Sequence, residues 1–313
     1  MKISVAIPCY KSSKTINKVV EDIVKTIKAK ESYSYQIILV NDYPSDNTFD
    51  VIKELCAKDH NIIGVNLSRN YGQTAAKMAA IPYFNGDVLV FMDDDGQHPV
   101  EYIFKLVEKI QEGYDAVYAY FSEKKHTKFK QITSSVNSKI LEMNGTKPKG
   151  IHISSFYALS KFAVETYTDY KSPFPSMGGY LNTVIEKSAE IELPHRERIS
   201  GVSNYSFIKL IKLFFTGFFN FSVVPLRFLT FFGILFSLLG FGFGLFVIIR
   251  KLIVPYISAG YTSIVSIMLF LGGLVLFALG FIGEYIGRIY MTVSNMQQYK
   301  VREVVKYDKD KKE

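Results

Sequence analysis

The chain has 313 residues, enough for two ordinary domains or for one domain with an appendage, and 48% of them are hydrophobic. Its formal net charge of +8 suits an anionic partner: nucleic acid, a phosphorylated substrate or an anionic lipid surface. Cys9 and Cys56 show no CxxC spacing and no Cys/His cluster, which argues against zinc and favours reduced thiols in a cytosolic domain.

Short apolar runs alternate with amphipathic segments from the first residues onward, and the N-terminus lacks the long apolar region of a secretory signal. The expected buried strands are Ile3–Ile7, Gln36–Val40, Ile62–Leu67, Val88–Met92 and Ala116–Ala119. The expected helices are Thr15–Lys30, Thr48–Lys58, Thr74–Phe84 and Val100–Gln111. This alternation predicts βαβ units and an α/β fold with a mostly parallel, Rossmann-like sheet. Ligands of such sheets bind in the loops after the carboxyl ends of the strands.

A basic stretch, Lys124–Lys149, carries seven lysines against the single acid Glu142. It is either a solvated helical face with a mobile loop, or a substrate lid or lipid-facing patch. A second short α/β portion, Ser154–Pro194, completes a cytoplasmic domain expected over residues 1–204.

Two uncharged stretches, Phe228–Ile249 and Thr262–Gly283, have 22 residues each, which suffices to cross a hydrocarbon core of about 30 Å. The sequence therefore predicts a transmembrane hairpin over 226–284, and this favours lipid over nucleic acid as the anionic partner. Basic residues are more numerous outside the hairpin than on its link, which places both termini, including a basic tail at 285–313, in the cytoplasm. The expected location is thus the cytoplasmic membrane, with two spans whose glycines would allow close helix packing and so a homo-oligomer.

A juxtamembrane segment, 205–225, precedes the hairpin. Lys209, Lys212, Thr216 and Asn220 are spaced 3, 4 and 4 residues apart and so draw one polar stripe on an otherwise Phe/Leu/Ile-rich helix. That pattern is typical of an amphipathic helix in the membrane interface, although a helix packed in a soluble core would show it too.

Three carboxylates, Asp93, Asp94 and Asp95, follow the expected strand Val88–Met92 directly. Alternation along a strand would put Asp93 and Asp95 on one side, within reach of one ion. Carboxylate oxygens suit Mg²⁺ or Mn²⁺ bound together with substrate phosphates, and such an ion would neutralise a departing diphosphate. The alternative is a solvated acidic turn before the helix that begins near Pro99.

Two other strand ends carry polar groups. Asp42 ends one strand, where it could accept a hydrogen bond from a nucleobase N–H, while Ser45–Thr48 are explained by helix capping. Arg69 and Gln73 follow the next strand and offer a guanidinium and an amide near a diphosphate. Arg69 could instead form a structural ion pair.

The motifs AIPCY, VNDYPSDNT, LSRNYGQTAA and VLVFMDDDGQHP, in this order, resemble family 2 glycosyltransferases with the GT-A fold. The later motifs GVSNYSFIKLIKL, PLRFL and GEYIGRIY are similar to those of bacterial polyisoprenyl-phosphate glycosyltransferases, such as bactoprenol glucosyltransferases and undecaprenyl-phosphate formamido-arabinose transferases. The resemblance covers nearly the whole chain. It implies inverting transfer of a sugar from a nucleotide-sugar, with UDP as the implied nucleotide, to undecaprenyl phosphate for cell-surface glycans.

The resemblance also implies roles for individual residues. The nucleotide contacts it implies are Pro8, Tyr10, Asp42, Arg69, Gln73 and Asp94. The expected metal ligands, for Mg²⁺ or Mn²⁺, are Asp93 and Asp95. The expected contacts of the acceptor phosphate are His195, Arg196, Arg198 and Lys209. The catalytic set is then Asp93, Asp95, Arg69 and Arg198.

Two departures from the family pattern leave an alternative open. The family turn Asp-Asp-Gly-Ser is replaced by Asn41-Asp42-Tyr43-Pro44, and an acid found in relatives is absent from Ser154-Ser155-Phe156. A lipid monophosphate has a second pKa of about 6 and needs no general base, which makes the second departure a weak objection. The alternative is a non-catalytic membrane scaffold or sugar-lipid binding protein. A processive polysaccharide synthase is disfavoured, because the chain has no tryptophan for the acceptor motif of those enzymes.

Overall fold

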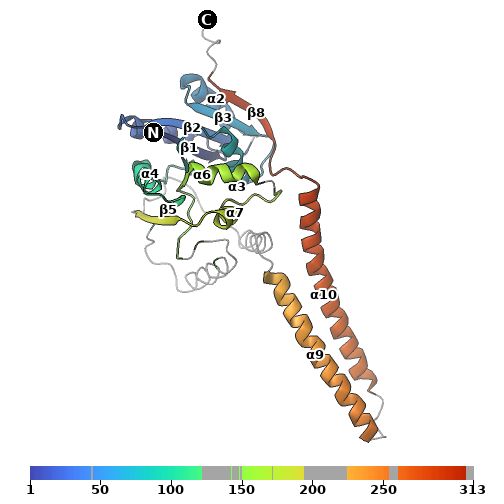
Figure 1. The fold of residues 1–313 in the computed structure, drawn as a ribbon. Helices are drawn as coiled ribbons and strands as arrows, with labels where there is room; N and C mark the ends of the chain where they lie inside the picture. The colour runs from blue at the N-terminus through green and yellow to red at the C-terminus, as the bar shows by residue number, and fades with distance from the viewer. Residues whose placement is uncertain are drawn as a thin grey trace. The chain divides into compact units, whose positions relative to one another are not determined.

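A computed structural model of the chain describes residues 1–43, 45–121, 142, 148, 150–170, 172–193, 224–253 and 260–307. The chain divides into two compact units. One is an α/β unit formed by Met1–Gly217 together with Asn295–Glu313, and the other is a helical unit formed by Phe218–Ser294. Figure 1 shows the fold in chain order, and each unit is described separately below.

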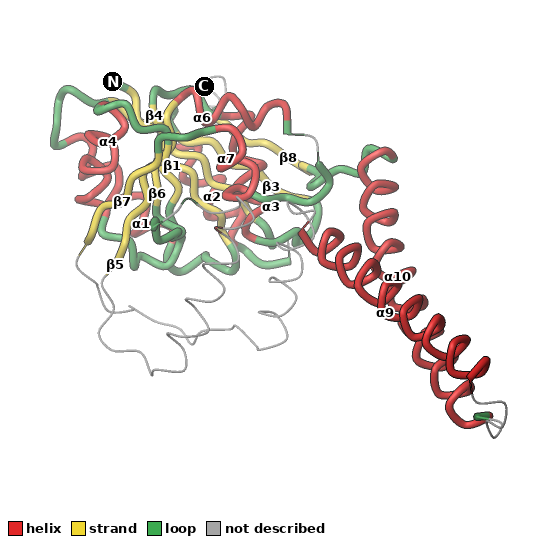
Figure 2. Tube along the Cα trace, turned by 60° about the horizontal axis from the view of Figure 1, so that its bottom comes forward, coloured by secondary structure: helices red, strands yellow, loops and turns green. Residues whose placement is uncertain are grey.

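The α/β unit is built on a mixed sheet with the strand order β7-β5-β6-β4-β1-β2-β3-β8 (Figure 2). Its strands are β1 Lys2–Cys9, β2 Ser34–Asn41, β3 Ile62–Leu67, β4 Val88–Phe91, β5 Ala116–Phe121, β6 Tyr157–Ser160, β7 Ser188–Leu193 and β8 Val301–Lys306. The central strands β4, β1, β2 and β3 are parallel, whereas β6 runs antiparallel to β4 and β5, and β8 runs antiparallel to β3. The carboxyl ends of four parallel strands therefore meet at one edge of the sheet.

Helices cover both faces of the sheet. One hydrophobic core packs α1 Ile16–Lys28, α2 Thr48–Lys58 and α4 Ile103–Gln111 against the sheet. The other packs α3 Gln73–Ala80, α6 Lys161–Thr166 and α7 Met177–Val184. This two-faced burial explains why the central strands are apolar along almost their whole length.

The five strands and four helices expected in the first part of the chain are all present, with shifted ends. The expected helix Thr74–Phe84 stops at Ala80 and continues as a 3₁₀ turn, Ile81–Tyr83, where Pro82 removes a backbone donor. The expected helix Val100–Gln111 likewise begins with a 3₁₀ turn, Val100–Tyr102, before α4. The α/β fold class predicted from the sequence is confirmed.

The C-terminal segment differs from the expected basic tail at 285–313. The helix α10 continues to Val293, and Val301–Lys306 forms β8 on the outer edge of β3. The run VREVVK is short and half of its residues are charged, so its sequence pattern predicts a tail rather than a strand. Its valines nevertheless suit the free edge of β3, where backbone pairing does not require an apolar face.

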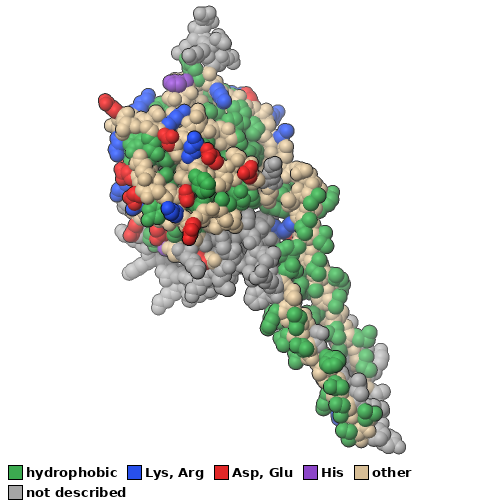
Figure 3. Space-filling model, viewed as in Figure 1, with side chains coloured by type: hydrophobic (Ala, Val, Ile, Leu, Met, Phe, Trp, Pro, Cys, Tyr) green, Lys and Arg blue, Asp and Glu red, His purple; other side chains and the backbone are tan. Residues whose placement is uncertain are grey.

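The helical unit consists of α9 Val224–Ile253 and α10 Tyr261–Val293. Hydrophobic side chains lie along the surface of both helices (Figure 3). Among the described residues, Phe270–Val293 is the one helical segment long and apolar enough to cross a membrane, by length and composition. The apolar part of α9, Leu229–Phe243, is shorter than the length needed for a span. The described residues therefore support one of the two expected spans. The expected amphipathic helix lies almost wholly outside the described residues.

Candidate active site

The loops after β1, β2, β3 and β4 carry the polar residues that the sequence singles out. Parallel pairing places the end of β1 beside the end of β2, and the end of β2 beside that of β3, while β4 ends beside Ala6, three residues before the end of β1. Tyr10, Asp42, Arg69 and Asp93 each follow one of these strands within two residues. They therefore belong to one edge of the sheet, where ligands of such folds bind.

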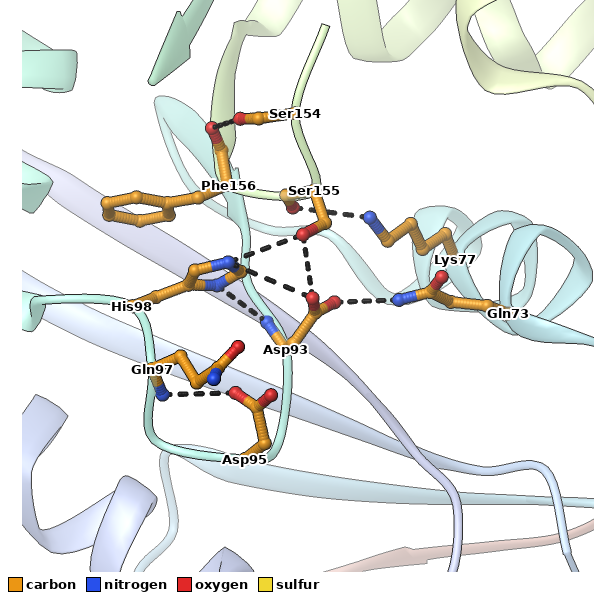
Figure 4. A network of polar contacts seen from close by, with 9 residues as sticks. All are labelled: Gln73, Lys77, Asp93, Asp95, Gln97, His98, Ser154, Ser155 and Phe156. Atoms are coloured by element: carbon orange, nitrogen blue, oxygen red, sulfur yellow. Dashed lines mark hydrogen bonds and ion pairs between the residues drawn. The ribbon is translucent and has the colours of Figure 1, made fainter. Parts of the chain in front are cut away.

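Asp93 is held by donors from two other elements (Figure 4). Its Oδ1 accepts a hydrogen bond from Nε2 of Gln73 at 2.7 Å, and its Oδ2 accepts one from Oγ of Ser155 at 2.6 Å. Gln73 is the first residue of α3, and Ser155 lies just before β6. The Asp93 side chain keeps 23% of its surface exposed, so it is fixed but still open to a ligand.

His98 contacts both Asp93 and Ser155 and so belongs to the same hydrogen-bond network. Its Nδ1 accepts a hydrogen bond from the backbone N–H of Asp93 at 3.0 Å, and its Nε2 lies 3.3 Å from Oγ of Ser155. The imidazole stacks on Phe156 with 5.0 Å between ring centroids. Burial lowers the pKa of His98, although Asp93 and Asp95 oppose this. We infer a neutral ring with its proton on Nε2, because Nδ1 is already an acceptor.

Lys77 brings a buried cation to the same place. Only 7% of the residue is exposed, and its Nζ donates to the carbonyl oxygen of Ser155 at 3.2 Å. The ammonium also lies 5.0 Å from the centroid of the Tyr157 ring. Burial lowers the pKa of Lys77 to about 8, with Asp93 acting in the opposite direction. A buried lysine is costly to a fold, which makes this position a candidate for a functional role.

Asp94 turns back toward the first loop. Its Oδ2 accepts the backbone N–H of Tyr10 at 3.0 Å and the hydroxyl of Ser12. Burial raises the pKa of Asp94, and these hydrogen bonds oppose the rise. Asp94 thus braces the loop that carries Tyr10, and the expected contact with a nucleotide stays a prediction.

Asp95 bonds within its own turn, where its Oδ1 accepts the backbone N–H of Gln97 at 3.0 Å. Strand β4 ends at Phe91, so a turn rather than strand alternation sets the directions of Asp93 and Asp95. Within the described part of the chain, no group of three or more His, Cys, Asp or Glu side chains could by itself hold a metal. A cation here would depend on one or two carboxylates and on oxygens brought by a ligand, which is how Mg²⁺ is usually held.

Asp42 is 3% exposed, and both of its oxygens accept backbone N–H groups, from Tyr71 and from Gly72, at 2.8 Å each. Burial raises the pKa of Asp42, while the two N–H groups oppose the rise. The side chain therefore orders the loop between β3 and α3. In that loop the Arg69 guanidinium lies 4.8 Å from the centroid of the Tyr71 ring, a cation–π contact rather than the ion pair considered from the sequence.

Two tyrosines and a lysine form an exposed surface beside these loops. The rings of Tyr10 and Tyr43 meet edge to face at 5.1 Å, and Nζ of Lys11 lies 4.8 Å from the centroid of Tyr43. Tyr10 keeps 49% of its surface exposed. Pro8 is different, because it is buried within β1 opposite Val40. A flat ligand would find aromatic faces at Tyr10 and Tyr43 rather than at Pro8.

The remaining expected site residues, His195, Arg196, Arg198 and Lys209, lie outside the described residues. The residues that sequence reasoning missed are Lys77, His98 and the contact made by Ser155. Two of them left a weak signal: Lys77 interrupts the small apolar run of α3, and His98 follows Asp93 by five positions. Neither signal points to Ser155, which contacts both side chains from a distant segment.

The chain was compared with known proteins. The model of glycosyl transferase family 2 matches residues 4–168, and the model of the GtrB C-terminal hairpin matches residues 224–289. An undecaprenyl-phosphate 4-deoxy-4-formamido-L-arabinose transferase of Proteus mirabilis (strain HI4320) is 32% identical over 99% of this chain and 96% of that protein. The SfII prophage-derived bactoprenol glucosyl transferase of Shigella flexneri is 31% identical over 96% of this chain and 98% of that protein. A solved glucosyl-3-phosphoglycerate synthase from Mycobacterium tuberculosis, in complex with UDP, is 17% identical with a TM-score of 0.47, covering 67% of this chain and 74% of that chain.

Proposed function

The chain belongs to glycosyl transferase family 2, and from this premise we propose that it moves a sugar from a nucleotide-sugar onto the phosphate of a polyisoprenyl lipid. One observation carries the acceptor assignment: relatives named for transfer to undecaprenyl phosphate or bactoprenol align over at least 96% of the chain, hairpin included. Membership of the family makes the chain a glycosyltransferase. This disfavours the non-catalytic scaffold that the altered turn and Ser155 had left open.

The donor would lie across the loops at the carboxyl edge of the sheet. Tyr10 and Tyr43 offer aromatic faces to the base, and Arg69 is exposed on the next loop, where it can compensate diphosphate charge. Asp42 and Asp94 would act indirectly, because each holds one of these loops through backbone N–H groups. UDP is the nucleotide we expect, from the resemblance to the family alone.

The carboxylate oxygens of the site, together with the diphosphate of a nucleotide-sugar, suit a divalent cation, Mg²⁺ or Mn²⁺. Asp93 and Asp95 would hold it together with diphosphate oxygens, since the described residues supply too few ligands for a closed protein cage. When bound, such an ion would act as a Lewis acid on the leaving diphosphate. The orientation of Asp93 is fixed beforehand by Gln73 and Ser155.

The reaction we propose is one inverting displacement. A phosphate oxygen of the lipid attacks the anomeric carbon and forms the new C–O bond with its lone pair. The bond from that carbon to the nucleoside diphosphate breaks, and its electron pair leaves on the diphosphate. A lipid phosphate with a second pKa of about 6 is largely a dianion at neutral pH, so Ser155 need not act as a base. His195, Arg196, Arg198 and Lys209 are proposed to position that dianion.

The hairpin would bring the chain to the membrane that holds the acceptor. Its match to the GtrB C-terminal hairpin supports two spans, α9 and α10. The α/β unit is proposed to lie on the cytoplasmic side, because basic residues are more numerous outside the hairpin than on its link. Two helices with exposed apolar side chains along their length suit lipid contact. A homo-oligomer stays a prediction.

Acceptor dependence tests this function. Protein purified in detergent would be incubated with Mn²⁺ and a panel of nucleotide-sugars, and release of nucleoside diphosphate would be measured. With one donor we expect release only when undecaprenyl phosphate is present. Undecaprenol, which lacks the phosphate, is the matched control and should give background release. Equal release with the alcohol would contradict the proposed acceptor chemistry, and no release with any donor would contradict transfer.

A further inference from the structure

We propose that Ser155 and His98 are positioning residues, which hold the Asp93 carboxylate in one orientation toward the cation and diphosphate of the donor. This inference rests on the proposed function and deepens it. It starts from three hydrogen bonds that form a closed ring through Asp93, Ser155 and His98 (Figure 4).

The direction of each hydrogen bond in the ring follows from the donors available. The Asp93 N–H can only donate, so Nδ1 of His98 accepts, and the neutral ring then carries its proton on Nε2. The Ser155 hydroxyl has one proton, which it gives to Oδ2 of Asp93 at 2.6 Å. Its oxygen is then the acceptor for Nε2–H of His98 at 3.3 Å. The ring thus starts at the backbone of Asp93 and returns to its carboxylate.

Helix α3 holds both Asp93 and Ser155 from the other side. Gln73 and Lys77 are four residues apart and so lie on one helix face. Gln73 donates to Oδ1 of Asp93, while Lys77 donates to the backbone carbonyl of Ser155. Both carboxylate oxygens of Asp93 therefore accept a hydrogen bond, and Ser155 forms hydrogen bonds through both its hydroxyl and its backbone carbonyl.

This arrangement leaves Asp93 able to bind a cation. A carboxylate has about four acceptor sites, and the bonds from Gln73 and Ser155 use two of them. The side chain also stays 23% exposed. A hydroxyl at 155 suits this role, because an ionised acid at the same place could only accept hydrogen bonds and would repel Asp93.

The first test compares neighbouring serines. Ser155→Ala removes the donor to Asp93, and Ser155→Thr keeps a hydroxyl. Ser154→Ala is the matched control, because Oγ of Ser154 donates to the carbonyl oxygen of Phe156 instead. Calorimetry would measure the dissociation constant of Mn²⁺ in the presence of whichever of UDP, GDP, CDP or dTDP binds wild type most tightly. We expect Ser155→Ala to weaken Mn²⁺ binding about tenfold, as for other groups that orient a metal ligand, and the other two variants to stay within about threefold of wild type.

The second test separates the two nitrogens of His98. His98→Asn keeps an acceptor near the Asp93 N–H but loses the donor to Oγ of Ser155. His98→Gln has a longer side chain, whose NH₂ group can still donate to Oγ of Ser155. Both variants lose the stacking on Phe156, so their melting temperatures should fall alike. We expect Mn²⁺ affinity to fall about tenfold in the Asn variant and to be largely kept in the Gln variant.

Two outcomes of the serine test overturn the inference: unchanged Mn²⁺ affinity in Ser155→Ala, or an equal loss in Ser154→Ala. Affinities of the two His98 variants that simply follow their melting temperatures would also overturn it, because His98 would then be structural. A wild-type protein that binds Mn²⁺ with none of the four nucleotides would instead contradict the proposed function. The two failures are therefore distinguishable.

Discussion

Asp42 and Asp93 both follow the end of a parallel strand, but they serve the site in different ways. Asp42 is buried, and both of its oxygens accept hydrogen bonds from the backbone of the loop that carries Arg69. Asp93 is partly exposed and is itself held by side chains. Sequence position alone does not separate a carboxylate that orders a loop from one that can meet a ligand, because the difference lies in which donors reach it.

Asp42→Asn tests the loop-ordering role. The amide keeps one acceptor oxygen and turns an NH₂ group toward a backbone N–H, so we expect a loss of about 1–3 kcal/mol in stability. Displacement of Arg69 should also raise the KM for the nucleotide-sugar. Thermal unfolding and donor kinetics check both effects. Unchanged unfolding together with lost nucleotide binding would instead favour the base contact expected from the sequence.

Lys77→Met tests the buried cation through pH. The pKa of Lys77 is about 8 in the fold and 10.5 in an unfolded chain, so between these values the unfolded chain binds more protons. Stability of the wild type should therefore rise as pH increases from 8 to 10.5 and be lowest below 8. Met keeps the apolar stem without the charge, so the variant should be more stable at neutral pH by at most about 3 kcal/mol.

Unfolding midpoints at pH 7, 8, 9 and 10 measure that difference. The advantage of the Lys77→Met variant should shrink across the series. Lys105→Met is the matched control, since Lys105 is exposed and also lies over a tyrosine ring, 4.9 Å from the centroid of Tyr102. A gap between wild type and Lys77→Met that stays constant with pH would contradict a buried, charged Lys77.

The carboxylates of the site were predictable, and their partners were not. A run of three acids after an apolar strand is visible in the sequence, because a strand end fixes where the acids lie. Ser155 reaches Asp93, and Lys77 reaches Ser155, only through β6 pairing beside β4 and α3 packing across the sheet. Such contacts join residues 62 and 78 positions apart, and no local pattern marks them.

At the scale of elements, local patterns predicted the βαβ part of the fold and missed the antiparallel strands. The runs before residue 120 are long, apolar and separated by amphipathic helices, so each is recognisable alone. Strand β6 has four residues and β8 is rich in charge, so neither stands out. The two segments form strands by pairing with β4 and β3, and those partners are brought next to them only when the chain folds.

The segment between α10 and β8 contacts two loops, one of which carries Arg69. The N–H of Ser68, directly before Arg69, donates to the carbonyl oxygen of Lys300 at 2.9 Å. Nε2 of Gln298 donates to the carbonyl oxygen of Ser172 at 2.6 Å, in the loop before α7. These bonds tie the segment after the hairpin to the loop before α7 and to the Arg69 loop, on which the donor would rest.

Gln298→Leu removes the side-chain donor while keeping a similar volume. Because a hydrogen bond contributes about 1 kcal/mol, we expect the donor KM to rise about fivefold. Gln297→Leu is the matched control, since Gln297 is exposed next to it. Steady-state kinetics with varied nucleotide-sugar measures the effect. An equal KM in the two variants would show that the Gln298 contact does not influence donor binding.

At the scale of the whole molecule, β8 constrains how the chain can meet a membrane. Strand β8 pairs with β3, so residues 301–306 lie on the same side as the rest of the sheet. The chain between 193 and 301 must then cross a membrane an even number of times. Counting the described helices alone, either both α9 and α10 cross or neither does, and of these Phe270–Val293 is the segment that meets the length and apolarity of a span.

Labelling with a membrane-impermeant thiol reagent tests this topology. Glu31→Cys and Gly260→Cys place exposed thiols in the α/β unit and on the link of the hairpin, while Cys9 and Cys56 are buried. In intact cells we expect reaction at position 260 but not at 31, and in inverted vesicles the reverse. Reaction of both positions from the same side would contradict a two-span hairpin.

We propose that the protein carries out cation-assisted transfer of a sugar to a lipid phosphate, and mass spectrometry of the lipid product would detect that transfer itself. Wild type with undecaprenyl phosphate, its donor and Mn²⁺ should give one species heavier than the acceptor by a single sugar residue. Asp95→Asn should reduce that product by about 100-fold or more without changing the unfolding temperature, and the exposed control Asp22→Asn should match wild type. Full product from Asp95→Asn, or from wild type in excess chelator, would contradict this account.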